Sequence, residues 1–183
     1  MTPLGILAAT LAAWLAGVDA PAFVEPEPRL EVHIGPSEDL EAVDLRVIGR
    51  ARSSIDLAAY VLTDKAVIAA LDERAAASVV ERIYLDPSEL RQAQYDAAFV
   101  TLAKMPGVEA RTKPMGVLMN LKFMVVDGAL LRTGSANMSW SGLTRQDNDI
   151  VVIADAPAAR RYSEAFERMW GWPDNSRFGG RGR

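Results

Sequence analysis

Short stretches of alternating or continuous apolar residues recur along the chain, and stretches with helical periodicity separate them. The first kind predicts strands over 30–34, 54–62, 79–85, 108–111, 121–126, 129–133 and 150–154. Apolar residues three and four positions apart predict helices after Ser37 and over 65–77, 88–104 and 157–170. Ser37, Thr63 or Asp64, and Ser88 are the expected N-caps. This alternation predicts an α/β fold with a mixed, largely parallel sheet and helices on both faces.

The two ends of the chain differ from this pattern. Residues 3–18 are apolar and uncharged but shorter than the roughly 20 residues of a membrane span, so residues 1–22 are interpreted as a signal peptide or N-terminal anchor. An ordinary buried helix is the alternative. Residues 23–29 read as a Pro- and Glu-containing linker, residues 30–172 as the folded domain and residues 173–183 as a flexible tail. We therefore expect an exported, periplasmic or membrane-anchored protein.

Composition narrows the chemistry. The chain has 183 residues, half of them hydrophobic, which fits one domain with a core. Its net charge of −4 argues against coating nucleic acid by bulk charge, although a local basic patch remains compatible with phosphate binding. The absence of cysteine excludes thiol catalysis, and a single histidine, His33, excludes a multi-histidine metal site within one chain. We expect no metal and no cofactor, and no chemistry from His33.

The segment 120–137 carries the strongest candidate chemistry. On a strand, the side chains of Asn120 and Lys122 project to the same face and can meet one phosphate. Residues 134–137, which include Gly134, Ser135 and Asn137, offer backbone N–H groups and small polar side chains to an anion. Together these groups predict a phosphate pocket that needs no metal, in which the lysine stabilises the charge of the transition state.

Three residues around this segment have plainer explanations. Asp127 and the glycine after it form a strong hairpin signal. Trp140 is a candidate for the pocket rim, and Arg111 for contact with a nucleic-acid backbone, but packing and ordinary surface charge explain most such residues.

The spacing of Asn120, Lys122, Asp127, Gly134 and Ser135 resembles the H-x-K-x4-D-x6-G-S pattern of the phospholipase D superfamily, with asparagine where the histidine should stand. Residues 52–60 and 141–149 are similar to the flanking segments of its single-motif bacterial endonucleases. The resemblance implies a histidine that attacks phosphorus, a phosphohistidine intermediate and a second motif that protonates the leaving oxygen. One motif per chain then implies a two-fold homodimer. It also implies that Lys122 and Asp127 are catalytic, and that an acidic residue orients the histidine, for which Asp147 is the candidate.

Position 120 separates binding from turnover, because an asparagine amide is neither a phosphoryl nucleophile nor a proton shuttle near neutral pH. Three interpretations are open: an engineered inactive variant, a natural pseudoenzyme and a coincidental near-match. The completeness of the rest of the motif favours the first.

The leading functional hypothesis is a metal-independent phosphodiesterase, a sequence-nonspecific endonuclease acting on DNA or RNA, here inactivated by Asn120. The alternatives are a phospholipase D or cardiolipin hydrolase and a non-catalytic phosphate-binding module. A long groove with basic walls would favour nucleic acid, and an apolar channel would favour lipid.

Overall fold

The computed structural model describes residues 29–88, 97–114 and 116–178. The predicted leader over 1–22 and all but the last residue of the predicted linker lie outside these ranges. No helix within them is both long enough and apolar enough to cross a membrane.

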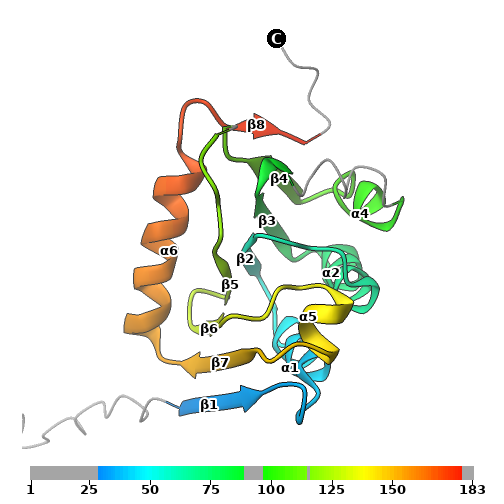
Figure 1. The fold of residues 1–183 in the computed structure, drawn as a ribbon. Coiled ribbons are helices and arrows are strands. Elements are labelled where there is room, and N and C mark those ends of the chain that lie inside the picture. Colours follow the sequence, from blue (N-terminus) through cyan, green and yellow to red (C-terminus); the bar gives the residue numbers. More distant parts are fainter. Residues whose placement is uncertain (1–28, 89–96, 115, 179–183) are drawn as a thin grey trace, which may run out of the picture.

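A single mixed sheet of eight strands organises the described ranges (Figure 1). Its order is β1-β7-β6-β5-β2-β3-β4-β8. The strands are β1 (Arg29–Ile34), β2 (Ser54–Ala59), β3 (Val80–Leu85), β4 (Val108–Thr112), β5 (Lys122–Val126), β6 (Leu130–Thr133), β7 (Asp149–Ala154) and β8 (Ser176–Arg177).

The sheet is mixed, as predicted, but the prediction that it is largely parallel is wrong. Only the β2–β3 and β3–β4 pairs are parallel, and the other pairings are antiparallel. Parallel neighbours need a crossover connection, and in this order only the segments that contain α2 and α4 supply one between adjacent strands. The β5–β6 hairpin instead inserts an antiparallel pair beside β2.

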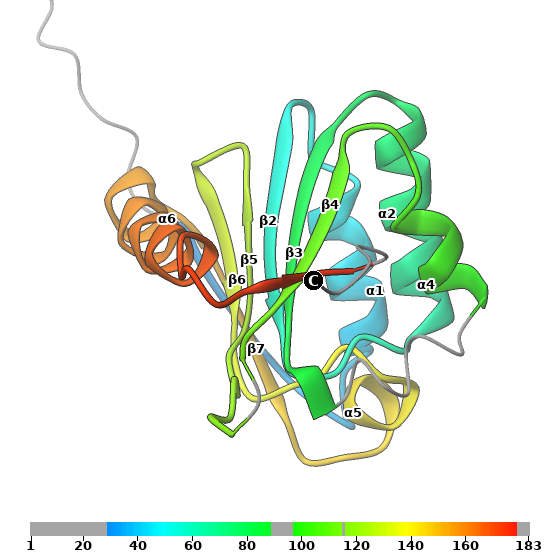
Figure 2. The same ribbon diagram turned by 90° about the horizontal axis from the view of Figure 1, so that it is seen from above.

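Helices cover both faces of the sheet, as predicted. One face carries α1 (Leu40–Ile48), α2 (Lys65–Ala76), α4 (Ala97–Leu102) and α5 (Trp140–Thr144). The other carries α6 (Ala156–Trp170), which runs across the strands (Figure 2). Buried apolar side chains form one cluster under each layer. Under α6, Phe166 stacks on Trp170 at a centroid distance of 5.4 Å, because residues four apart share one helix face.

Helix starts follow from local capping. Asp64 caps α2 by accepting hydrogen bonds from the N–H groups of Ala66 and Val67, as one of the two predicted caps. The prediction of Ser37 as the cap of α1 is wrong: Asp39 takes that role, while the Ser37 hydroxyl donates to the carbonyl of Ile34. In the predicted helix over 88–104, residues 89–96 lie outside the described ranges and α4 occupies part of the remainder.

The C-terminal tail was predicted to be flexible, but residues up to 178 are anchored. Asn175 accepts a hydrogen bond from the Tyr84 hydroxyl and donates to the carbonyls of Met169 and Trp170. β8 pairs with β4, and Phe178 packs edge-on against Phe99. The Gly-, Pro- and Arg-rich composition of this segment predicted flexibility, and nothing in it indicated that Asn175 and Phe178 would make these contacts.

Candidate active site

Four strands bring the motif segments to one edge of the sheet. The end of β2, the start of β5, the end of β6 and the start of β7 lie there, because β2 and β6 run antiparallel to β5 and β7. Phe123 pairs with Thr133, so the ladder places Gly134 level with Lys122. The carbonyl of Met138 accepts hydrogen bonds from the N–H groups of the loop that follows β2. Residues 120–122 and 134–138 are therefore neighbours, as the motif predicted.

Lys122 is the cation of this edge. Its ammonium donates to the backbone carbonyl and to Oδ1 of Asn120, at 2.8 and 2.7 Å, and lies 5.1 Å from the centre of the Tyr60 ring. Burial, together with the nearby charge of Arg132, lowers the pKa of Lys122 below its ordinary value. Among the described residues, no carboxylate forms an ion pair with this lysine. The side chains at 120 and 122 thus meet, as the strand geometry predicted.

Gly134 is required by its backbone geometry. Its φ is 145°, a conformation that favours glycine, and a Cβ atom there would lie 2.3 Å from the carbonyl oxygen of Asp149. The close approach lets Ser135 and Asp149 join through three hydrogen bonds. The Ser135 hydroxyl donates to Asp149 Oδ1 at 2.6 Å, the Ser135 N–H donates to the same oxygen at 3.1 Å, and the Asp149 N–H donates to Ser135 Oγ at 2.9 Å.

The acidic residue that touches the motif is therefore Asp149 and not Asp147, the candidate chosen from the sequence. Asp147 lies exposed in the bend before β7. In the antiparallel pairing of β6 with β7, Thr133 lies opposite Val151. Continuing this register by two residues places Ser135 opposite Asp149. The register of β6 with β7 would therefore have identified Asp149. It is hard to predict from sequence, because 15 residues that include α5 separate the two strands.

Asn137 and Trp140 lie beside this pair. Asn137 is half-buried, and its Oδ1 atom is buried without a hydrogen-bond partner. The Ser139 hydroxyl accepts a hydrogen bond from the Gly142 N–H and so starts the short helix α5. Trp140, the first residue of α5, is 58% exposed, and the Arg145 guanidinium lies 5.2 Å from its ring. Its place on the rim of a phosphate pocket stays a prediction.

Asp127 is not at this edge. It lies at the opposite end of β5, about 16 Å from Lys122 at the usual rise of a strand. Its carboxylate accepts hydrogen bonds from the N–H groups of Arg52, Ser53 and Ser54 and from the Ser53 hydroxyl. Partial burial would raise the pKa of Asp127, but these hydrogen bonds lower it below its usual value. We therefore assign Asp127 to the fold, in correction of its predicted catalytic place.

Arg111 does not meet Lys122, and its predicted contact with a nucleic-acid backbone stays a prediction. Its strand, β4, is three strand spacings from β5, about 14 Å. The guanidinium donates to Glu109 at 2.8 Å and to the carbonyl of Trp170 at 2.7 Å, and lies 4.2 Å above the Trp170 ring. These contacts fix Arg111 against α6.

The single histidine has a structural environment. His33 contacts Glu38 at 2.7 Å and Glu31 at 3.5 Å, on the face of β1 that meets α1. β7 and β6 separate its strand from β5. His33 therefore does not reach position 120.

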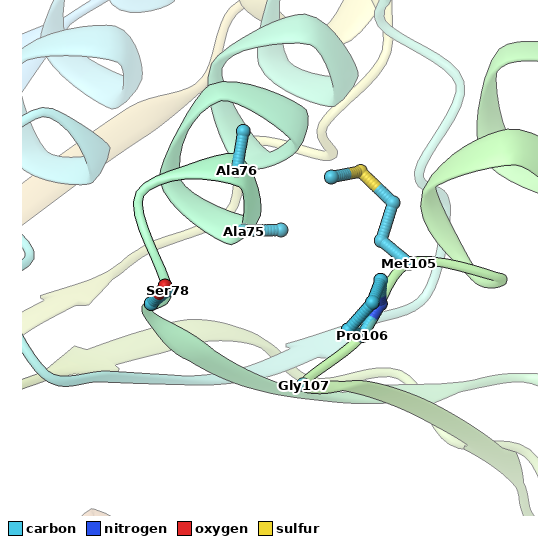
Figure 3. A pocket seen from close by; sticks show the side chains of 6 residues that line it. All are labelled: Ala75, Ala76, Ser78, Met105, Pro106 and Gly107. Carbon is cyan, nitrogen blue, oxygen red and sulfur yellow. The ribbon is translucent and has the colours of Figure 1, made fainter.

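A cavity of about 370 Å³ lies elsewhere (Figure 3). It is bounded by the end of α2 and the turn before β4, and its lining residues are Ala75, Ala76, Ser78, Met105, Pro106 and Gly107. Because Ser78 and Gly107 precede the starts of β3 and β4, the cavity is at the edge opposite Lys122. Its lining contains no charged side chain that could bind an anion. In the described ranges, no three His, Cys, Asp or Glu side chains gather as metal ligands would.

The sequence is similar to a known protein family and to curated proteins. The sequence model for "Cardiolipin synthase, PLD-like domain" matches residues 45–170. A mitochondrial cardiolipin hydrolase from Chlamydomonas reinhardtii is 23% identical over 69% of this chain and 55% of its own length. A phospholipase D from Rickettsia bellii is 33% identical over 63% of this chain and 56% of its own length. The chain thus spans about half the length of these curated relatives.

Two solved structures share the fold. The phospholipase D family member Nuc from Salmonella typhimurium superposes with a TM-score of 0.72 at 22% identity, covering 83% of this chain and 99% of Nuc. NucT from Helicobacter pylori gives 0.70 at 19% identity, covering 79% of this chain and 96% of NucT. Since the family match extends over more than half of the sequence and includes both motif segments, a coincidental likeness is excluded and the chain belongs to the phospholipase D superfamily.

Proposed function

We propose that the edge around Lys122 binds a phosphodiester, and that the chain is an endonuclease-type phosphodiesterase whose cleavage step is disabled by Asn120. One observation carries the proposal. Lys122 is a partly buried cation whose contacts are a carbonyl, an amide and an aromatic ring. By contrast, Arg82, Arg111 and Arg132 all pair with carboxylates. A desolvated, unneutralised cation is suited to an anionic ligand.

The chemistry follows from the groups present. Lys122 supplies a point charge for a phosphate oxygen, and the exposed Ser135, held by Asp149, presents a hydroxyl beside it. Asn120 occupies the nucleophile position of the family motif but has no lone pair basic enough to attack phosphorus. The expected behaviour is binding without turnover.

Nucleic acid is the leading substrate class. The fold of this chain matches the solved structures of Nuc and NucT over almost their whole lengths. Two exposed tryptophans carry cations at this end of the sheet: Arg145 lies over Trp140, and Lys113, which follows β4, lies 5.9 Å from the centre of the Trp172 ring. Exposed aromatic rings beside cations are typical of surfaces that bind single strands.

A phospholipid is the second candidate, and a different surface favours it. Val117, Leu118 and Leu121, immediately before Lys122, are 60%, 61% and 43% exposed. Large apolar side chains beside a phosphate site suit acyl chains, and the curated relatives bear the names cardiolipin hydrolase and phospholipase D.

We also propose a two-fold homodimer in which a second copy covers exposed apolar side chains of β1. Glu31 and His33 of β1 contact Arg46 of α1, so the alternate residues of the strand face the opposite side. Of these, Val32 and Ile34 are 53% and 50% exposed. Ile34 pairs with the first residue of β7 and thus lies at the edge that holds the site. A second copy seated there would add a second Lys122 to one cleft.

Binding of a labelled single-stranded oligonucleotide at fixed salt tests the site. Lys122→Ala should weaken binding at least about tenfold, because it removes a partly buried cation that no carboxylate among the described residues neutralises. Lys104→Ala, which removes the same charge at the opposite edge, is the matched control and should change affinity less than twofold. Equal effects of the two substitutions would remove Lys122 from the site. Cardiolipin vesicles in a parallel assay distinguish the lipid candidate, and light scattering before and after Ile34→Asp tests the dimer.

A further inference from the structure

A buried ion pair lies directly behind the candidate site. Arg132 of β6 and Asp44 of α1 are both 0% exposed. Two hydrogen bonds join them in a fork, Nε to Oδ1 at 2.6 Å and Nη2 to Oδ2 at 2.9 Å. Burial raises the pKa of Asp44, and the charge of Arg132 opposes that rise. The pair fixes the plane of the guanidinium in the interior.

The remaining N–H groups of Arg132 reach the backbone of the site. Nη1 lies 3.4 Å from the carbonyl oxygen of Lys122 and 3.3 Å from that of Ala136, and Nη2 lies 3.3 Å from the latter. One side chain therefore contacts both segments that build the edge: the start of β5 and the loop that carries Ser135 and Asn137. Within the described residues, no other side chain joins these two segments by hydrogen bonds to both.

Stability alone does not account for this arrangement. Taking an arginine and an aspartate out of water costs free energy, and well-packed apolar residues of similar volume are often as stabilising as such a pair. What apolar residues cannot do is hold two carbonyl oxygens at a fixed separation. Arginine can, because its donors are planar and spread over a fork, whereas lysine offers one ammonium.

We propose that Arg132 is a positioning residue, clamped by Asp44, which sets the distance between the Lys122 ammonium and the Ser135–Asn137 loop by holding their backbones. The inference rests on the proposed phosphodiester site. It adds that the site's geometry is fixed from the sheet face that carries α1, by Asp44 and by a residue at a position that the family motif leaves unspecified. The charge of Arg132 also contributes to the lowered pKa of Lys122, in agreement with their closeness.

A paired apolar substitution separates positioning from folding. Asp44→Leu combined with Arg132→Met removes both buried charges together and leaves neither unpaired. The matched control is Asp56→Leu with Arg82→Met, because Arg82 bonds only the carboxylates of Asp56 and Glu167. Urea unfolding measures stability, and binding of the labelled single-stranded oligonucleotide over a salt series measures the site.

We expect both double variants to fold. The Asp44/Arg132 variant should lose at least about tenfold in oligonucleotide affinity, and its salt dependence should fall by about 0.7 in log–log slope, the contribution of one phosphate contact on a single strand. The control should stay within twofold of the parent. An Asp44/Arg132 variant with the parent's affinity and slope would overturn the positioning role.

Arg132→Lys is a second test of the positioning role, which can be used if the double variant does not fold. It retains a cation for Asp44 but cannot span both carbonyls, so the same loss of affinity is expected. Unchanged binding by Arg132→Lys, with Lys122→Ala still weakened, would refute the inference while the proposed function stands. If Lys122→Ala binds as tightly as the parent, the proposed site fails and the positioning role fails with it.

Discussion

Glu81 on β3 gives the protein a pH-dependent weakness. Its side chain is fully enclosed, and neither carboxylate oxygen has a hydrogen-bond partner. Burial, with the charge of Asp72 and against that of Arg74, raises its pKa from an ordinary 4.5 to about 8. Because the folded-state pKa of Glu81 is the higher one, its contribution to stability is most favourable at low pH and falls as the pH rises from 4.5 to about 8.

The size of the effect follows from those two values. Each pH unit between them costs about 1.4 kcal/mol of unfolding free energy, so ionisation of Glu81 lowers stability by about 3 kcal/mol at pH 7 and by about 4 to 5 kcal/mol above pH 8. Glu81→Gln replaces the carboxyl by a neutral group of the same shape. It should exceed the parent by these amounts at high pH, and by less than about 1 kcal/mol at pH 5.

Urea unfolding of the parent and of Glu81→Gln at pH 5, 7 and 8.5 measures the difference between their unfolding free energies. The other titrating groups are the same in both proteins, so their contributions cancel in this difference. Glu73→Gln, at an exposed position of α2, controls for the change from carboxylate to amide. A gap between the parent and Glu81→Gln that stays constant across the three pH values would refute the reasoning. So would a gap that narrows as the pH rises.

Three further predictions concern the site. Asn120→His should create phosphodiesterase activity that persists in chelator and exceeds the parent at least about a thousandfold, with a trapped phosphohistidine; a parent of equal activity, or strict dependence on added metal, would contradict it. Gly134→Ala should cost at least about 2 kcal/mol in urea unfolding, because a Cβ atom would meet the Asp149 carbonyl at 2.3 Å. Asp149→Asn should weaken oligonucleotide binding by disturbing Ser135, whereas Asp147→Asn should not; the reverse result would restore Asp147 as the acidic partner.

Local sequence patterns predicted most of the strands and helices. The alternation in 30–34 and the Asp127-Gly128 pair are examples, and the φ values of 51° and 67° at that pair are those of the expected tight hairpin turn. Strand directions were not predictable in the same way. β5 pairs with β2 across more than 60 residues, and no local pattern states whether such neighbours run parallel or antiparallel.

The candidate site was predictable where its members are close in sequence. Asn120 and Lys122 meet because they are two residues apart on extended chain. Asp149 was missed because its contact with Ser135 depends on the register of β6 with β7, which the intervening helix and loop obscure. Arg132 was missed because a charged residue within a strand ordinarily indicates a surface position, and only its pairing with Asp44 permits burial.

The position of Asp127 affects how mutagenesis of this motif should be interpreted. Its carboxylate gathers four donors from residues 52–54 and so joins the hairpin to the beginning of β2. The other end of β2 leads to Tyr60, whose ring lies under the Lys122 ammonium. In an Asn120→His background, loss of activity on substitution of Asp127 would thus report altered pairing of β5 with β2, about 16 Å from Lys122, and not the loss of a proton carrier.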